Sequence, residues 1–324
     1  MTVYDVFNGD ADGICALLQM RHAEPIKSQL TQPKLITGVK RDIKLLAQVN
    51  AEQGDQVNVL DVSMDKNKAD LIRLLDEGAK VFYCDHHVAG DIPAHANLSA
   101  LINPAADVCT SLLINGRLNG AFSHWAIVGA FGDNLKKSAQ ALARTTNISS
   151  EQIMSLENLG IYINYNGYGA SLCDLHFEPA ELYRLLYRYK NPLDFIQDDV
   201  IHFNQLESGY QEDMAKAKKA DTLKETAASA AFLLPNEKWA RRVSGVYGND
   251  LANQYPDRAH AVLTSGPDDT YLVSVRAPLS NKTDADTLCM EFPTGGGRKA
   301  AAGINALPAA MLDTFLDRLD SIYS

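Results

Sequence analysis

Four segments of the chain place acidic side chains directly after apolar runs, and one of them adds two adjacent histidines. The residues are Asp10 and Asp12 in NGDADG, Asp61 in VLDVS, Asp85, His86 and His87 in YCDHH, and Asp133 in GAFGDN. Several carboxylates gathered in one partly buried place repel one another, and a bound divalent cation removes that cost. Carboxylate oxygens mixed with one or two imidazoles suit Mn²⁺ or Mg²⁺ better than they suit a structural zinc ion, which prefers thiolates and histidines.

Each segment also has a simpler interpretation when it is taken alone. GDADG is a typical turn sequence, and an aspartate such as Asp61 after an apolar run is often a helix cap. Adjacent histidines such as His86 and His87 often lie at a protein surface. The order of the four segments, each at the end of a predicted element, favours one shared metal site.

The elements that would position these residues read as a parallel sheet. TVYDVF predicts a strand ending near Phe7, QVNVL one running into Asp61, and AKVFYC one running into Asp85. Between the last two strands, SMDKNKADLIRLLDEG has helical periodicity, and Gly78 is placed to end the helix. Strand, helix, strand in this order predicts a parallel sheet, which binds ligands outside the carboxyl ends of its strands.

The rest of the chain predicts more helices and then a second domain. SHWAIVGAFGDN reads as a buried helix capped by Ser123 and ending near Asp133, and residues 149–196 are helical in pattern. QEDMAKAKKADTLKETAASAAF is polar and alanine-rich, which favours a helix or hinge between domains. After about Pro235, RRVSGVYG, AHAVLTS and TYLVSVRAP read as strands, and a short helix closes the chain. We therefore expect an α/β protein with domains at 1–196 and 236–324, joined by a helical linker at 197–235.

Composition narrows the partners that this protein is expected to have. The formal net charge of −10 and the pI of about 5.3 disfavour binding to long nucleic acid, which needs a basic track, and point to a small anionic substrate. The five cysteines form no CxxC pair, and neither a signal peptide nor a transmembrane stretch is evident. We expect a cytoplasmic protein that does not bind membranes, with a homodimer as the generic oligomer.

The acidic segments in their order resemble the DHH phosphoesterases. The resemblance rests on DADG, a lone aspartate after a strand, DHH and GAFGD, with INPAADVCTS similar to the family's asparagine-proline and serine segment. SVR followed by GGGRKAAAG resembles the type-1 DHH-associated domain found in members that degrade short oligonucleotides, the nanoRNase-like or oligoribonuclease-like proteins. The resemblance implies a Rossmann-like catalytic domain joined by a helical linker to a smaller α/β domain, with the active site in the cleft between them.

The resemblance also implies a role for each candidate residue. Two metal ions are expected, with Asp10 and Asp12 each ligating one, Asp61 bridging both, and His86 and Asp133 ligating the second. Asp85 would orient the imidazoles, and His87 would contact the scissile phosphate. Asn8 would be the remaining ligand, but members carry histidine or aspartate there, and an amide oxygen binds these ions more weakly. This departure makes the first metal site the weaker of the two.

The C-terminal glycine-rich segment is the expected substrate-binding region. Gly295, Gly296 and Gly297 would let backbone N–H groups approach an anion, with Arg276 and Arg298 as charge partners. The family often has histidine where this chain has Arg298, whose planar guanidinium suits a phosphate. The simpler interpretations are a turn followed by a helix start, and for Arg276 a residue at a strand edge.

The leading hypothesis is a Mn²⁺-dependent phosphodiesterase, with Mg²⁺ as the alternative ion, in which two metals activate water. Its substrates would be short oligoribonucleotides or linear dinucleotides, such as the pGpG formed when cyclic dinucleotide signals are opened, and its products mononucleotides. The alternatives are a phosphatase for 3′-phosphorylated nucleotides such as pAp, and a non-catalytic nucleotide-binding protein with a weakened metal site. Pyrophosphatase activity is disfavoured because those members carry a different C-terminal domain.

Overall fold

In the computed structural model, which describes residues 1–25 and 32–324, Met1–Ser208 form one unit around a five-stranded sheet. Its strand order is β2-β1-β3-β4-β5, and every neighbouring pair is parallel. The strands are β1 (Val3–Phe7), β2 (Lys34–Ile36), β3 (Gln56–Leu60), β4 (Lys80–Asp85) and β5 (Leu98–Ile102). The parallel sheet predicted from the sequence is therefore confirmed.

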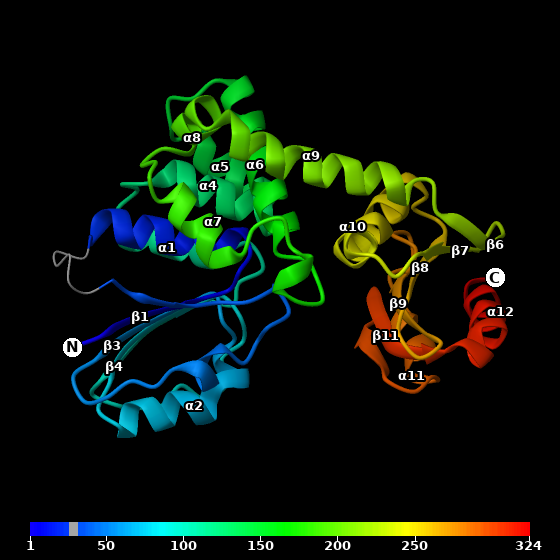
Figure 1. Cartoon of the computed structure of the whole chain (residues 1–324), viewed down its shortest axis with the longest axis horizontal. Helices are drawn as coiled ribbons and strands as arrows, with labels where there is room; N and C mark the ends of the chain where they lie inside the picture. Colours follow the sequence, from blue (N-terminus) through cyan, green and yellow to red (C-terminus); the bar gives the residue numbers. More distant parts are fainter. Residues whose placement is uncertain (26–31) are drawn as a thin grey trace. The chain divides into compact units, whose positions relative to one another are not determined.

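Helices cover both faces of this sheet. Figure 1 shows α2 (Met64–Asp76) on one face and α1 (Ala11–Ala23) on the other. α1 packs against α3 (Thr110–Arg117) and α4 (Ser123–Gly132), and α4 packs in turn against α6 (Ser150–Asn166). The remaining elements of this unit are η1 (Leu45–Gln48), α5 (Lys136–Ala143), η2 (Leu172–Asp174), α7 (Pro179–Leu186) and α8 (Pro192–Asp198).

The predicted helices of the N-terminal unit are confirmed, with one change in a cap. α2 ends as expected at Gly78, which has a positive φ of 86° and donates its N–H to the Leu75 carbonyl. α4 is the expected buried helix, but Ser123 is its first residue, because Phe122 occupies the N-cap position. The Ser123 hydroxyl donates to the Gly120 carbonyl at 2.8 Å and stabilises the preceding turn instead.

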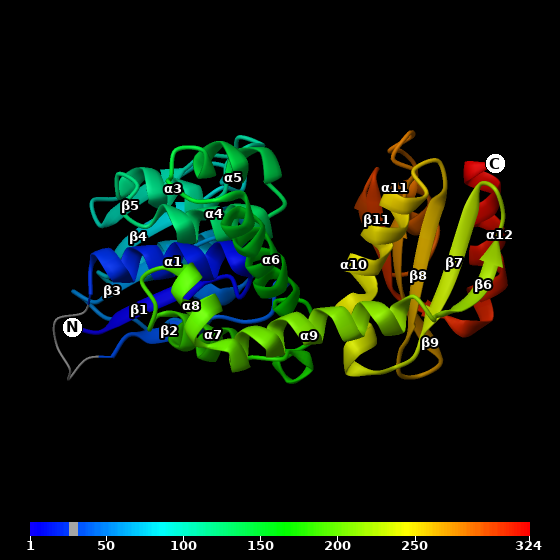
Figure 2. The ribbon, with the colours of Figure 1, turned by 90° about the horizontal axis from the view of Figure 1, so that it is seen from above.

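The C-terminal unit, Gly209–Ser324, contains a six-stranded mixed sheet of order β10-β11-β9-β8-β7-β6. Its strands are β6 (Asp221–Glu225), β7 (Ser229–Leu234), β8 (Ala259–Ser265), β9 (Thr270–Arg276), β10 (Gly295–Arg298) and β11 (Ala301–Pro308). Within this unit, α10 (Lys238–Gln254) and α12 (Leu312–Tyr323) lie on opposite faces of the sheet (Figure 2). The other elements are α11 (Ala285–Met290) and η3 (Ala309–Met311), and α9 (Val200–Ala217) runs from the first unit into the second.

Two secondary-structure predictions in this part of the chain are wrong. Residues 221–234 of the predicted helical linker form β6 and β7, because the small side chains of Ser229, Ala230 and Ala231 are buried in the sheet. RRVSGVYG was expected to be a strand but belongs to α10. Val243, Tyr247 and Leu251 recur every four residues and are all buried, and this spacing buries one face of a helix. Among the described residues, no helix combines the length and apolar character needed to cross a membrane.

The buried His260 in β8 should make the C-terminal unit sensitive to acid. Burial, and then the neighbouring Arg258, lowers the pKa of His260 to about 4. Its unfolded pKa is about 6.5. The unfolded chain therefore takes up a proton between these values, and stability falls as the pH falls. We expect a loss of about 2 kcal/mol between pH 7 and pH 5.

The measurement is urea denaturation of the full chain at both pH values, followed by the fluorescence of Trp239 in a Trp125→Phe background. These are the chain's two tryptophans, one in each unit. His260→Gln, which cannot be protonated, should abolish most of the difference, and His95→Gln, at an exposed position in the other unit, should leave it unchanged. An equal pH dependence in His260→Gln would contradict this explanation.

Candidate metal centre

Three neighbouring parallel strands bring the predicted metal-binding residues to one edge of the N-terminal sheet. β1 ends at Phe7 and leads into the NGDADG loop, whereas β3 ends directly before Asp61. β4 ends at Asp85, directly before His86. Because β1, β3 and β4 are adjacent and parallel, their carboxyl ends share an edge. Asp61 takes a left-handed conformation with φ of 58°, and its N–H donates to the Cys84 carbonyl of the neighbouring strand.

Asp12 is fixed by a second helix far away in the sequence. Its two carboxylate oxygens accept the backbone N–H groups of Thr110 and Ser111, each at 2.7 Å, and the Ser111 hydroxyl also donates to it. Both donors lie in the first turn of α3, where free N–H groups favour an anion. The Asp12 carboxylate is only 1% exposed, and these donors hold it in one orientation.

His86 presents one ring nitrogen to three carboxylates. Its Nδ1 lies 3.1 Å from the Val108 carbonyl, which can only accept a hydrogen bond, so Nδ1 is the donor to this carbonyl and Nε2 is the ring atom turned toward the acids. Nε2 lies 3.3 Å from Asp61 Oδ1, 3.8 Å from Asp133 Oδ2 and 4.0 Å from Asp12 Oδ2. This is the arrangement that a metal-ligating imidazole requires.

Two overlapping groups of side chains in the described residues could each hold a metal ion. One comprises Asp61, His86 and His87, and the other Asp12, His86 and Asp133. His86 belongs to both groups, so they describe one locality. The donors are carboxylate oxygens with imidazole nitrogen, which fits Mn²⁺ or Mg²⁺ and lacks the thiolates of structural zinc sites.

The carboxylates of this cluster repel one another. Burial, followed by the charges of Asp12 and Asp10, raises the pKa of Asp61 well above its ordinary value. Burial and the charge of Asp12 likewise raise the pKa of Asp133 to about 7, although Lys40 opposes the shift. Acids held in this way gain more from a divalent cation than exposed acids do.

Asp85 and His87 form a hydrogen-bonded pair, and His87 also belongs to the first of the two groups described above. The buried Asp85 accepts at Oδ1 from the backbone N–H of His86 at 2.9 Å and from Nδ1 of His87 at 2.7 Å. The hydrogen bond to Asp85 raises the pKa of His87, against the opposing effect of burial. The His87 side chain is 46% exposed, so its Nε2 can reach an anionic ligand in the cationic state.

Asp10, another of the predicted ligands, lies beside a lysine that the sequence did not single out. Asp10 caps α1 by accepting from the N–H groups of Asp12 and Gly13, and its second oxygen lies 2.6 Å from Lys40 Nζ. Burial raises the pKa of Asp10, but the charge and hydrogen bond of Lys40 outweigh this, so the pKa lies below its ordinary value. Neither Asn8 nor Asp10 belongs to the two metal-binding groups.

The predicted substrate-binding residues lie together in the C-terminal unit. Gly295, Gly296, Gly297 and Arg298 form β10, so the alternative of a turn followed by a helix start is wrong. Arg298 is exposed, and through the intervening β11 it stands in register with Arg276 at the end of β9.

Two of the glycines are required by the backbone, and a third is free of contacts. Gly297 has a φ of 147°, and a Cβ there would meet Ala302 Cα at 2.4 Å. A Cβ on Gly295 would meet the Cys289 carbonyl at 1.7 Å, whereas one on Gly296 would meet nothing within 4 Å. Arg276 is held by hydrogen bonds to Asn249 and to backbone carbonyls. The segment is therefore a braced strand with one open glycine.

Comparisons with known proteins show the same fold across nearly the whole chain. A DHH-domain protein, described as a member of a family of ribosomal proteins, has 14% identity over 99% of this chain and 86% of its own, with a TM-score of 0.67. The RecJ exonuclease bound to manganese has 16% identity over 99% and 90%, with a TM-score of 0.64. The pGpG-specific phosphodiesterase PggH from Vibrio cholerae has 14% identity over 99% of this chain and 98% of its own, with a TM-score of 0.54. No protein-family model and no curated protein sequence matches the chain.

At these identities the likeness concerns the fold. This chain has the fold of the DHH proteins, with the five-stranded parallel sheet of the N-terminal unit and the mixed sheet of the C-terminal unit. The fold that the sequence motifs implied is therefore confirmed. The similar structures include RecJ bound to Mn²⁺ and, in a separate structure from Thermus thermophilus, to Mg²⁺.

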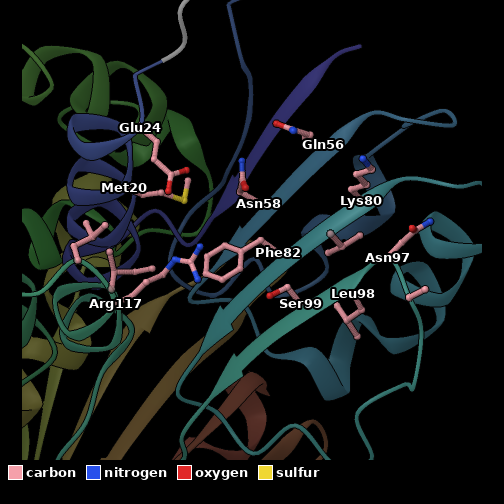
Figure 3. A pocket seen from close by; sticks show the side chains of 14 residues that line it. Met20, Glu24, Gln56, Asn58, Lys80, Phe82, Asn97, Leu98, Ser99 and Arg117 are labelled. Atoms are coloured by element: carbon pink, nitrogen blue, oxygen red, sulfur yellow. The ribbon is translucent and has the colours of Figure 1, made fainter.

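A groove of about 360 Å³ lies at the opposite ends of the strands, where β3, β4 and β5 begin (Figure 3). Gln56, Lys80 and Leu98, the first residues of these strands, line it. The Arg117 guanidinium lies 4.7 Å from the centre of the Phe82 ring in the same groove. None of its lining residues belongs to either group of possible metal ligands found in the described part of the chain. The groove is therefore separate from the candidate metal centre.

Replacing Asp61 with asparagine should stabilise the metal-free protein and abolish metal binding. Asparagine tolerates the left-handed backbone of this position and removes one of the mutually repelling charges. A relief of about 1 kcal/mol would raise the melting temperature in EDTA by roughly 2–4 °C. In wild type, Mn²⁺ should raise the melting temperature, and in Asp61→Asn this shift should be lost. Asp91→Asn, at an exposed acid, is the matched control. A full Mn²⁺ shift in Asp61→Asn would contradict the assignment of Asp61 as a ligand.

Proposed function

We propose that this protein is a metal-dependent phosphodiesterase that hydrolyses short oligoribonucleotides or linear dinucleotides, such as pGpG, to mononucleotides. The observation that carries the proposal is the convergence of Asp12, Asp61 and Asp133 on the Nε2 atom of His86. The fold shared with RecJ and PggH supports it, since one is described as an exonuclease and the other as a pGpG-specific phosphodiesterase.

Mn²⁺ is the proposed ion, held by Asp12, Asp61, His86 and Asp133. Three carboxylates and one imidazole form a mixed oxygen and nitrogen set that suits Mn²⁺, and RecJ, which shares the fold, is described as bound to manganese. When bound, the ion supplies Lewis-acid charge and activates water for attack on a phosphodiester. The residues of the chain supply the geometry: α3 fixes Asp12, and Val108 fixes the ring of His86.

His87 is proposed to donate from Nε2 to an oxygen of the scissile phosphate. Asp85 holds the opposite ring nitrogen at 2.7 Å and raises the pKa of the imidazole, which keeps it cationic closer to neutral pH. A cationic donor stabilises the charge that builds on phosphoryl oxygens as the leaving group departs. Asp85 therefore acts through His87 as a positioning residue.

The C-terminal unit is proposed to bind the substrate through its phosphates. Gly296 has open space above its backbone, and Arg298 is exposed. Arg276 is oriented by Asn249, at 2.6 Å from its Nε. Arginine and free backbone N–H groups are well suited to bind phosphate oxygens. This arrangement supports a short anionic substrate, in keeping with the acidic balance of the chain.

The decisive experiment measures Mn²⁺-dependent hydrolysis of 5′-labelled substrates from two to about seven nucleotides long. We expect mononucleotide products, the highest kcat/KM for the shortest substrates, and no turnover in EDTA or in Asp61→Asn. Asp91→Asn should have wild-type activity. Hydrolysis of pAp in preference to every dinucleotide would favour the phosphatase instead. Absence of turnover on all of these substrates, with Mn²⁺ bound, would disprove the proposal.

His87→Gln should lower kcat by roughly 100-fold with a smaller change in KM, because the lost interaction strengthens as charge develops on the phosphate. Mn²⁺ affinity should change little, since Asp12, Asp61, His86 and Asp133 remain. His95→Gln, at an exposed histidine outside the site, is the control. Steady-state kinetics together with calorimetric Mn²⁺ titration check both parts, and an unchanged kcat would exclude His87 from the reaction.

A further inference from the structure

We propose that this chain binds a single metal ion and that the ammonium group of Lys40 permanently takes the place of a second ion beside Asp10. The inference concerns the number of ions and not the substrate. It rests on the same metal centre as the proposed function. It departs from the two ions that the sequence motifs implied.

The contacts of Asp10 leave little capacity for an ion. Oδ1 accepts from the backbone N–H groups of Asp12 and Gly13 at 3.1 and 3.2 Å, as the cap of α1. Oδ2 lies 2.6 Å from Lys40 Nζ. Asp12 is as deeply buried, but its donors are neutral N–H and hydroxyl groups, whereas a cation at Asp10 Oδ2 would have to displace a charged ammonium group.

Lys40 is held in place from several directions. Its Nζ donates to Asn164 Oδ1 of α6 at 2.9 Å, and its backbone N–H donates to the Gly167 carbonyl at 2.8 Å. The loop that carries it packs tightly on the NGDADG loop, because a Cβ on Gly9 would meet the Gly38 carbonyl at 2.0 Å. An ammonium group fixed by these contacts resembles a bound ion more than a flexible surface charge.

The balance of charge also favours one ion. Asp10 and Lys40 form a neutral pair. By contrast, Asp12, Asp61 and Asp133 converge on His86, and no ion pair within the described residues joins any of the three to a lysine or arginine. A divalent cation would therefore be drawn to Asp12, Asp61 and Asp133, because Lys40 already compensates the charge of Asp10.

Asn8 indicates what would happen if the lysine were absent. Its Oδ1 atom is buried and has no hydrogen-bond partner among the described residues. Without Lys40, the freed oxygen of Asp10 would offer a donor together with the carboxylate of Asp61, which interacts with that of Asp10, and Asn8 carries its unpartnered oxygen in the same loop. Oxygen donors of this kind suit Mn²⁺, so removing the lysine should open a second site.

Within residues 1–25 and 32–324, hydrogen bonds to Asp10 and Asn164 use two of the three N–H donors of Lys40, and its Nζ also lies 5.7 Å from the centre of the Tyr168 ring. A third donor at this position can bind an anionic oxygen of a ligand, as an ion would. Its charge, unlike that of an ion, does not depend on the concentration of free metal. We therefore expect Mn²⁺ to bind with a simple one-site isotherm.

The test is the Mn²⁺ content of the full chain, measured by calorimetric titration and by elemental analysis after dialysis. Electron paramagnetic resonance distinguishes an isolated Mn²⁺ ion from a coupled pair. Wild type should bind one ion with the spectrum of isolated Mn²⁺, and Lys40→Met should bind two with the spectrum of a coupled pair. Lys66→Met, which removes an exposed lysine on α2, should bind one.

A second variant covers the case in which the unpaired Asp10 carboxylate of Lys40→Met prevents folding. The double variant Asp10→Asn with Lys40→Met removes both charges, and it should fold and bind one ion. Two ions in wild type, or one in folded Lys40→Met, would overturn the inference and leave the proposed function standing. No ion in wild type at saturating Mn²⁺ would overturn both.

Discussion

The parallel pairing of β1, β3 and β4 is the constraint on which the N-terminal unit depends. It brings the carboxyl ends of three strands to one edge, and each strand ends in an acid or is followed by one within three residues. The sheet therefore gathers like charges in a buried place, and burial together with their mutual repulsion raises the pKa of Asp61 and of Asp133. The contacts that the acids make at this edge compensate their charge.

Two kinds of compensation are present in the structure. Helix N-termini supply backbone N–H groups: α3 donates to Asp12, and the first turn of α1 donates to Asp10. Lys40 supplies a fixed positive charge through its ion pair with Asp10. Asp61 and Asp133 receive less compensation from helix N-termini and from Lys40 than Asp12 and Asp10 do. Both lie close to Nε2 of His86. The least compensated acids are thus the ones that a metal ion would join.

Much of this edge was predictable from the sequence, because its residues follow short strands at fixed positions. Lys40 was not, because β2 has only three residues and gives a weak strand pattern. The donors to Asp12 lie 98 and 99 residues away, and no local pattern reports such a contact. In the C-terminal unit, Val243 and Tyr247 in RRVSGVYG favour strands by type, but packing against β8 and β9 selects the helix.

The two adjacent histidines show how one strand end can place two imidazoles in different environments. Both rings are held through Nδ1, His86 by the Val108 carbonyl and His87 by Asp85. A carbonyl at Nδ1 orients the ring so that its Nε2 can act as a ligand, whereas a buried carboxylate favours the protonated ring and makes Nε2 a donor. The difference lies in the acceptor and not in the histidine. Exchanging Asp85 for a neutral acceptor should therefore convert His87 toward the behaviour of His86, with its pKa returning toward the ordinary value.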